Sequence, residues 1–343
     1  MTCTGFDKLP IQHRQQCPVL DFWEHCKSTL QLTLHTKEDS LSGVITESGI
    51  HRPGLAMAGY TDVYSAHQIQ MIGSTEWSFL ESVGAERRGI IFKKLSAYHS
   101  PLWVLTHNLK PHKELLAMCE AFGMPLASTS LQTVDFARDT QRILDAYFAP
   151  YTTVHGSLVD VYGVGMLYLG DSNVGKSECV LDLVEHGHRL VADDVVQMSK
   201  LGNAIIGHAS AIIGHHMEIR GIGIIDIRSM FGIHSVRKAK KIEVLVELQP
   251  WKQDATYDRT GLASTMENVM GQEIPRVLIP VSPGKNLTVI SEVIAMNTLM
   301  KMNGVDTARE FNDSLLKTIQ NKQQGRKAAS AFDEDPLMWD SYE

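Results

Sequence analysis

Residues 170–177 read Gly170-Asp171-Ser172-Asn173-Val174-Gly175-Lys176-Ser177. This segment matches the phosphate-loop pattern G-x-x-x-x-G-K-[ST], in which backbone N–H groups and a helix N-terminus surround a polyphosphate. An apolar run at 165–169 predicts the strand before the loop, and residues 177–185 predict the helix after it. Lys176 would add a positive charge, and the Ser177 hydroxyl would ligate Mg²⁺. A chance match is the alternative, but this context favours nucleotide binding by the whole segment.

The loop alone does not distinguish an ATPase, a GTPase and a kinase, so the residues that follow it have to be considered. Residues 190–192 predict a buried strand, and Asp193 and Asp194 follow it directly. Nucleotide enzymes hold a metal or a base at this position. If the strand continues, the two side chains point to opposite sides, so that one faces the phosphates and the other faces the metal ligands or a supporting contact. The alternative is a plain turn, where Asp is common.

Two more candidates lie outside the loop. Glu218, within the glycine-broken stretch 217–228, is a second candidate ligand because Mg²⁺ usually takes only one or two protein groups beside phosphate and water. An ordinary salt-bridged surface strand is the alternative. His155 comes before the strand predicted at 157–161, and an antiparallel hairpin of that strand with 165–169 would bring it to the phosphate side. A purely structural histidine is the alternative.

Three histidines at 208–216 offer a zinc site as a weaker alternative. It is weaker because their spacing matches no usual zinc site. Its ligands would be His208, His215, His216 and Glu218.

Composition narrows the class of protein. With 343 residues, 43% of them hydrophobic and 21% charged, the chain has ordinary globular composition, and its length predicts two domains. A net charge of −7 argues against broad nucleic-acid binding. The 5 cysteines are scattered without a Cys-x-x-Cys pair, which predicts neither a disulfide framework nor a cysteine zinc site. No apolar stretch long enough for a membrane span and no secretion signal are apparent, so we expect a cytoplasmic protein without membrane contact.

Periodicity divides the chain near residue 150. The first part alternates predicted strands at 90–92, 102–105 and 125–127 with predicted helices at 112–122 and 136–148. The second part predicts strands at 157–161, 165–169, 190–192, 204–206, 242–248 and 277–281, and helices at 177–185 and 287–301. We expect an N-terminal α/β domain at 1–149, with 1–17 an extension, a second domain at 150–320, and a polar, acidic, mobile tail at 321–343.

The combined motifs resemble the HPr kinase/phosphorylase family, bacterial enzymes that phosphorylate a serine of the phosphocarrier protein HPr. In the first half the resemblance rests on Arg52-Pro53-Gly54-Leu55, Gly59-Tyr60 and Met71-Ile72-Gly73. In the second half it rests on His155-Gly156, the loop through Gly175-Lys176-Ser177-Glu178, Ala192-Asp193-Asp194, residues 218–228, Tyr257-Asp258-Arg259, residues 283–287 and Ala295-Met296-Asn297. The resemblance implies a C-terminal P-loop kinase domain with a mixed, strand-rich sheet after the N-terminal α/β domain.

The resemblance also implies roles for single residues. It implies that the catalytic residues are His155, Lys176, Asp193 and Arg259. It also implies that Ser177 and Glu218 bind Mg²⁺. Asp193 would take the proton of the acceptor serine, and in reverse inorganic phosphate would attack phosphoserine and release pyrophosphate. ATP is the implied phosphoryl donor, with pyrophosphate as an alternative donor, and the implied assembly is a homohexamer. A serine kinase of the same fold with another protein acceptor, and a nucleotide-binding regulatory scaffold, remain as alternatives.

Three positions depart from the family pattern. Asn173 stands where many members have Gly, and Asn tolerates left-handed backbone better than most residues, so we expect nucleotide binding to persist. Cys179 stands where Thr is frequent. Lys285 stands where the family usually has Arg, in the expected dephosphorylation loop 280–285. A point charge there replaces a bidentate fork, so we expect weaker phosphorolysis.

Overall fold

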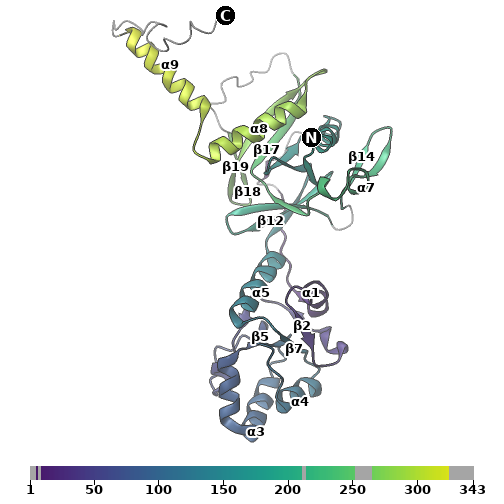
Figure 1. Ribbon diagram of the computed structural model, residues 1–343, viewed down its shortest axis with the longest axis vertical. Coiled ribbons are helices and arrows are strands. Elements are labelled where there is room, and N and C mark those ends of the chain that lie inside the picture. Colours follow the sequence, from purple (N-terminus) through teal and green to yellow (C-terminus); the bar gives the residue numbers. More distant parts are fainter. Residues whose placement is uncertain (1–4, 7–8, 211–213, 252–264, 324–343) are drawn as a thin grey trace, which may run out of the picture. The chain divides into compact units, whose positions relative to one another are not determined.

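The computed structural model describes residues 5–6, 9–210, 214–251 and 265–323 (Figure 1). The chain forms two compact units. The N-terminal unit consists of Ile11–Tyr151 with Ser199–Leu201, and the C-terminal unit consists of Met1–Pro10, Thr152–Met198 and Gly202–Glu343. Arg259 and the part of the expected tail beyond residue 323 lie outside the described residues.

The N-terminal unit is built on a five-stranded sheet in the order β2-β7-β6-β5-β4. Only β2 (Leu32–Leu34) runs antiparallel to its neighbour; the parallel strands are β4 (Ile50–His51), β5 (Ile69–Ile72), β6 (Trp103–Leu105) and β7 (Leu126–Thr129). The helices of the unit are α1 (Val19–Cys26), α2 (Gly54–Met57), α3 (Ser74–Ser96), α4 (Lys113–Ala121) and α5 (Thr133–Phe148). A short antiparallel pair, β1 (Cys17–Pro18) with β3 (Val44–Ile45), completes it.

Alternation along the strands divides the apolar side chains between two cores. In β6, Trp103 and Leu105 join a core with α2, α3 and α4, whereas Val104 joins the opposite core with α1 and α5. The sheet is therefore covered by helices on both faces. The prediction of a strand at 90–92 is wrong, because these residues lie within α3. Ile91 and Phe92 are buried and Ile90 is 65% exposed, a distribution that a three-residue apolar run does not reveal in advance.

The C-terminal unit contains a mixed six-stranded sheet in the order β11-β9-β10-β17-β19-β18. The pairs β10–β17 and β17–β19 are parallel, and the remaining pairs are antiparallel. The strands are β9 (Ser157–Val161), β10 (Val164–Leu169), β11 (Arg189–Ala192), β17 (Val244–Pro250), β18 (Thr265–Val269) and β19 (Gln272–Val281). The expected mixed, strand-rich sheet is confirmed.

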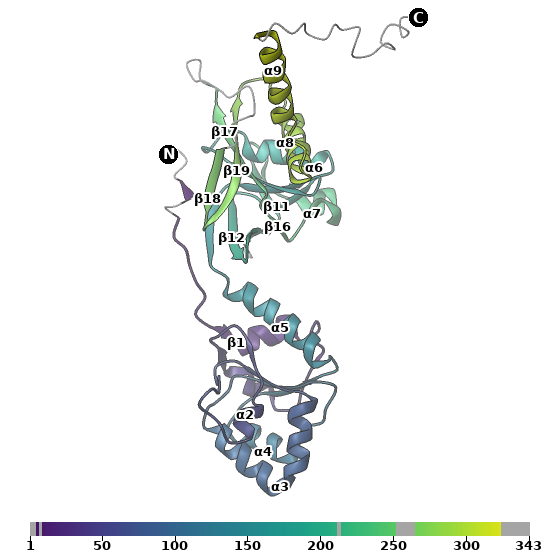
Figure 2. The same cartoon turned by 90° about the vertical axis from the view of Figure 1, so that its left-hand side faces the viewer.

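A second sheet has the order β16-β13-β12-β8, and a separate hairpin consists of β14 and β15. These elements are β8 (Tyr151–His155), β12 (Val195–Leu201), β13 (Ala204–Ala209), β14 (His216–Ile219), β15 (Gly223–Asp226) and β16 (Ala239–Lys241). The helices of this unit are α6 (Lys176–Glu185), α7 (Ile227–Phe231), α8 (Leu287–Met302) and α9 (Thr307–Gln323). Helices α6 and α8 lie against each other beside the six-stranded sheet (Figure 2).

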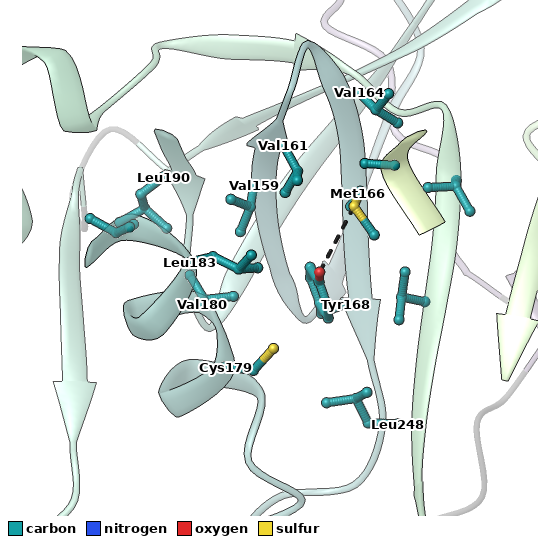
Figure 3. Close-up of a cluster of buried hydrophobic side chains, with 14 of the residues drawn as sticks. Val159, Val161, Val164, Met166, Tyr168, Cys179, Val180, Leu183, Leu190 and Leu248 are labelled. Atoms are coloured by element: carbon teal, nitrogen blue, oxygen red, sulfur yellow. Dashed lines mark hydrogen bonds between the residues drawn. The ribbon is translucent and has the colours of Figure 1, made fainter. Parts of the chain in front are cut away.

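The core beneath α6 fixes the helix that follows the phosphate loop. Cys179, Val180 and Leu183 of α6 point toward β9 and β10, where Val159 and Tyr168 are fully buried (Figure 3). Burying such apolar side chains contributes roughly 1.5–3 kcal/mol each. On the other face of the sheet, a second core includes Leu158 of β9 together with Phe6 and Leu9 from the start of the chain. The predicted hairpin of 157–161 with 165–169 is confirmed, since β9 pairs antiparallel with β10.

Candidate functional site

The loop between β10 and α6 has the backbone that its sequence predicts. Gly170, Asn173 and Gly175 have φ angles of 140°, 77° and 98°. A Cβ atom on Gly170 would lie 2.4 Å from the carbonyl oxygen of Leu248, so only glycine fits there without a shift. Asn173 takes the left-handed conformation that the sequence analysis expects it to tolerate.

Lys176, the first residue of α6, lies across the loop. Its Nζ atom donates to the carbonyl oxygens of Gly170 at 2.9 Å and Asp171 at 3.0 Å, and the residue is buried. The ammonium group is thus held inside the curve of the loop. A phosphate that enters the loop would meet this charge together with the N-terminus of α6.

Asp193 follows β11 in a turn rather than in a continuing strand. The N–H of Val195 donates to the Asp193 carbonyl at 2.8 Å, and Asp194 has a φ angle of 66°. The alternative of a turn is therefore confirmed for the backbone, while the two side chains make different contacts; a role for Asp193 as a base or metal ligand stays a prediction. The Asp193 carboxylate, 2% exposed, accepts hydrogen bonds from Ser177 at 3.0 Å and Ser157 at 2.5 Å. Burial raises the pKa of the Asp193 carboxyl, and these hydrogen bonds oppose part of that rise.

The second carboxylate contacts the predicted histidine. Asp194 Oδ1 lies 2.9 Å from His155 Nδ1, and both side chains are more than half exposed. The N–H of Gly156 also donates to the Asp194 carbonyl at 3.1 Å. The hairpin of β9 and β10 thus carries His155 to the side of the molecule where the loop lies, as the sequence analysis expects.

Most of the residues predicted from the sequence line one pocket. Glu218 of β14 reaches it, so the pocket combines groups from the loop, the β11–β12 turn, β8 and β14. Its lining consists of His155, Ser157, Ser172, Asn173, Gly175, Lys176, Ser177, Glu178, Asp193, Asp194, Glu218 and Arg220. The side chains provide two cations and several carboxylate and hydroxyl oxygens, a set suited to a nucleotide phosphate with a divalent metal.

The donor set fits Mg²⁺ better than zinc. Ser177, Asp193 and Glu218 offer hard oxygen atoms in one pocket, and Mg²⁺ needs only one or two such protein ligands. Within the described residues, no group of three or more His, Cys, Asp and Glu side chains is arranged to hold a metal ion. The alternative of a histidine zinc site therefore gains no support from the part of the chain that the structure describes.

The other predictions have different outcomes. Arg259 falls outside the described residues. Lys285 and Pro280, from the expected dephosphorylation loop, line a different pocket, between β19 and α8, and Lys285 Nζ donates to the Pro280 carbonyl at 2.7 Å. Sequence reasoning missed Ser157, whose only signal is a hydroxyl at the start of a buried strand, two positions after His155.

Comparison with known proteins gives a consistent result. Residues 19–144 match the description HPr Serine kinase N terminus, and residues 146–315 match HPr Serine kinase C-terminal domain. The HPr kinase/phosphorylase of Chloroherpeton thalassium is 40% identical over 337 residues, which cover 96% of this chain and 99% of that relative. The one of Geobacter sulfurreducens is 40% identical over 310 residues, with 90% and 97% covered.

A solved structure, the Hpr(Ser) kinase/phosphatase from Coxiella burnetii, is 31% identical, covers 47% of this chain and 98% of that chain, and has a TM-score of 0.43. In the described part of the chain, no helix has the length and apolar content needed to cross a membrane.

The matches to both domains and the identity over nearly the full length confirm the resemblance to the HPr kinase/phosphorylase family. The chain belongs to the HPr kinase/phosphorylase family of enzymes.

Proposed function

We propose that this enzyme transfers the γ-phosphoryl group of ATP to a serine of HPr, and that it reverses the transfer by phosphorolysis. In the reverse reaction inorganic phosphate attacks the phosphorus of phosphoserine, the serine oxygen leaves with a proton, and pyrophosphate forms. The observation that carries the proposal is the hydrogen bond from Ser177 of the phosphate loop to Asp193. This contact supports a role for the buried Asp193 carboxylate beside the terminal phosphate.

Asp193 acts as the general base toward the serine hydroxyl and as the general acid in reverse. A raised pKa suits this double role, because proton transfer is most effective when the pKa of the group lies near the working pH. His155, bound to Asp194, relays or tunes that proton from the exposed side of the pocket. Lys176 and the N–H groups of the loop orient the phosphates and stabilise their charge, which is the main part of catalysis in phosphoryl transfer.

Ser177 and Glu218 are the proposed Mg²⁺ ligands, and Arg259 is the proposed partner for phosphate or phosphoserine oxygens. Mg²⁺, when bound, neutralises charge on the phosphates of the nucleotide. Pyrophosphate is proposed as an alternative donor because it offers the same terminal group to the loop. A homohexamer and a cytoplasmic location stay predictions, based on the family resemblance and on the sequence.

The test is transfer of labelled phosphate from ATP to purified HPr in the presence of Mg²⁺. We expect one phosphate per HPr on serine, and release of pyrophosphate when phosphorylated HPr is incubated with inorganic phosphate. An HPr variant with the acceptor serine replaced by alanine serves as the control. Tight ATP binding with no transfer to HPr would contradict the proposal and favour a different acceptor or a nucleotide-binding scaffold.

A further inference from the structure

An irregularity in the six-stranded sheet determines what lies beside Asp193. Strand β11 pairs with β9 through Leu190 and Val159, and then through Ala192 and Leu158, so Val191 is an extra residue. This β-bulge shifts the register by one position. Asp193, which directly follows β11, therefore lies beside Ser157, the first residue of β9. Without the bulge, Ala192 would occupy that place.

The contact between these two side chains is short and fully enclosed. Ser157 is 0% exposed and Asp193 is 2% exposed. The Ser157 hydroxyl donates to Asp193 Oδ1 at 2.5 Å, while the Ser177 hydroxyl donates to Oδ2 at 3.0 Å and lies 3.3 Å from Oδ1. Two hydroxyl groups from different elements thus hold the carboxylate. A hydrogen bond to a charged group is among the stronger contacts in proteins.

The two hydroxyl groups are not equivalent. Ser177 belongs to the loop, and its oxygen is also the proposed Mg²⁺ ligand, so its position has to adapt to the bound nucleotide. Ser157 belongs to a buried strand in which every residue is enclosed. Of the side-chain hydrogen-bond donors to Asp193 that the structure describes, Ser157 is the one on a buried strand rather than on the phosphate loop.

We propose that Ser157 is a positioning residue for the phosphoryl-transfer reaction, holding Asp193 Oδ1 so that the carboxylate keeps one orientation toward the acceptor oxygen. The proposal rests on the role of Asp193 given under Proposed function. In this proposal Ser157 acts through the carboxylate to which it donates. Its loss should reduce the rate of transfer in both directions and leave nucleotide binding unchanged, because small misplacement of a reacting group affects the chemical step first.

The experiment compares Ser157→Ala with the wild type in transfer from ATP to HPr. We expect kcat to fall about tenfold in both directions, with the KM for ATP unchanged within about twofold. Ser157→Cys, which keeps a weak donor of similar shape, should recover part of the rate. Ser291→Ala is the matched control, since Ser291 is also fully buried in this unit and donates to the carbonyl of Leu287 within its own helix; its rate should equal the wild-type rate.

A second comparison separates positioning from a general structural role. In an Asp193→Asn background, adding Ser157→Ala should lower the residual rate no further, because residues that act as a unit are not additive. An equal further loss in that background would overturn the proposal, as would a wild-type kcat in Ser157→Ala or a loss that appears only in KM. A wild type that fails to phosphorylate HPr would contradict the proposed function instead, so the two failures are distinguishable.

Discussion

Both units contain a buried parallel strand that leads through glycine into a helix. The two helices differ in what lies at the backbone N–H groups of their N-termini. In the N-terminal unit, Gly73 alone separates β5 from α3. The Glu76 carboxylate turns back to accept from the Gly73 N–H at 3.1 Å, and Arg52 binds the same carboxylate through two contacts of 3.0 Å. The chain's own anion thus occupies the N-terminus of α3.

In the C-terminal unit, six residues separate β10 from α6, and the N-cap residue of α6 is Gly175, which has no side chain that could cap the helix. Helix α6 also has a carboxylate, Glu178, in its first turn, but no side-chain capping bond to its N-terminus is described. Instead the Lys176 ammonium group lies over the loop and donates to the Gly170 and Asp171 carbonyls. The comparison shows that a strand, a glycine and a helix do not by themselves make a phosphate site. The N–H groups must be left for an external anion, and a cation must lie over the loop.

The largest effect should come from removing that positive charge. Lys176→Ala is expected to reduce transfer to HPr about 1000-fold, because Lys176 is the cation of the loop. Steady-state transfer of labelled phosphate measures the loss. The matched variant in the other unit, Arg52→Ala, should leave the rate within about twofold of wild type. A similar loss in both variants would remove the distinction between the two helix N-termini.

Gly170 and Gly73 should respond differently to an added methyl group. At Gly170 the Cβ atom would meet a backbone carbonyl at 2.4 Å, so Gly170→Ala is expected to weaken ATP binding at least about tenfold. At Gly73 the Cβ atom would lie 2.8 Å from the Thr133 hydroxyl, and Gly73→Ala should affect local stability with no change in ATP affinity. Calorimetric titration with ATP distinguishes these outcomes; equal affinities in both variants would contradict this account.

Neutralising the carboxylate at α3 should destabilise only its own unit. Glu76→Gln weakens the contacts with Arg52 and with the helix N-terminus, at an expected cost of about 1–2 kcal/mol. Hydrogen exchange in peptides that cover β5 and α3 should become faster, while peptides that cover α6 keep their protection. If exchange at α3 is unchanged, water hydrogen-bonds the N–H groups at the N-terminus of α3 as well as Glu76 does, which would contradict this prediction.

The smallest expected effect concerns Lys285. Lys285→Arg restores a bidentate fork and should raise phosphorolysis of phosphorylated HPr roughly threefold, with little change in the forward rate. The two rates are measured as pyrophosphate release and as phosphate incorporation. An equal change in both directions would show that the residue acts on a step common to the two reactions, and not on phosphate attack.

Local patterns predicted much of this architecture because the chemistry of the loop is local. The loop segment, its flanking strand and helix, and the left-handed Asn173 all follow from neighbouring residues. The hairpin that brings His155 to the pocket also follows from two apolar runs joined by Tyr162 and Gly163. Such features depend on backbone preferences and on short-range pairing, which the sequence carries directly.

Other features depend on contacts between distant segments. The run at 90–92 has no period of its own, and tertiary packing places it in α3 rather than in a strand. The contact of Ser157 with Asp193 joins residues 36 positions apart and depends on a bulge at Val191. A one-residue shift in register is not visible in an apolar strand pattern, so this part of the site required the structure.

The central claim is that the buried Asp193 performs the chemical step and is not needed to bind nucleotide. The most direct measurement is the rate of phosphate transfer from ATP to HPr by Asp193→Asn, together with its dissociation constant for ATP. We expect the rate to fall at least about 100-fold and the dissociation constant to stay within about threefold of wild type. A wild-type rate, or a loss of rate matched by an equal loss of ATP affinity, would contradict the claim.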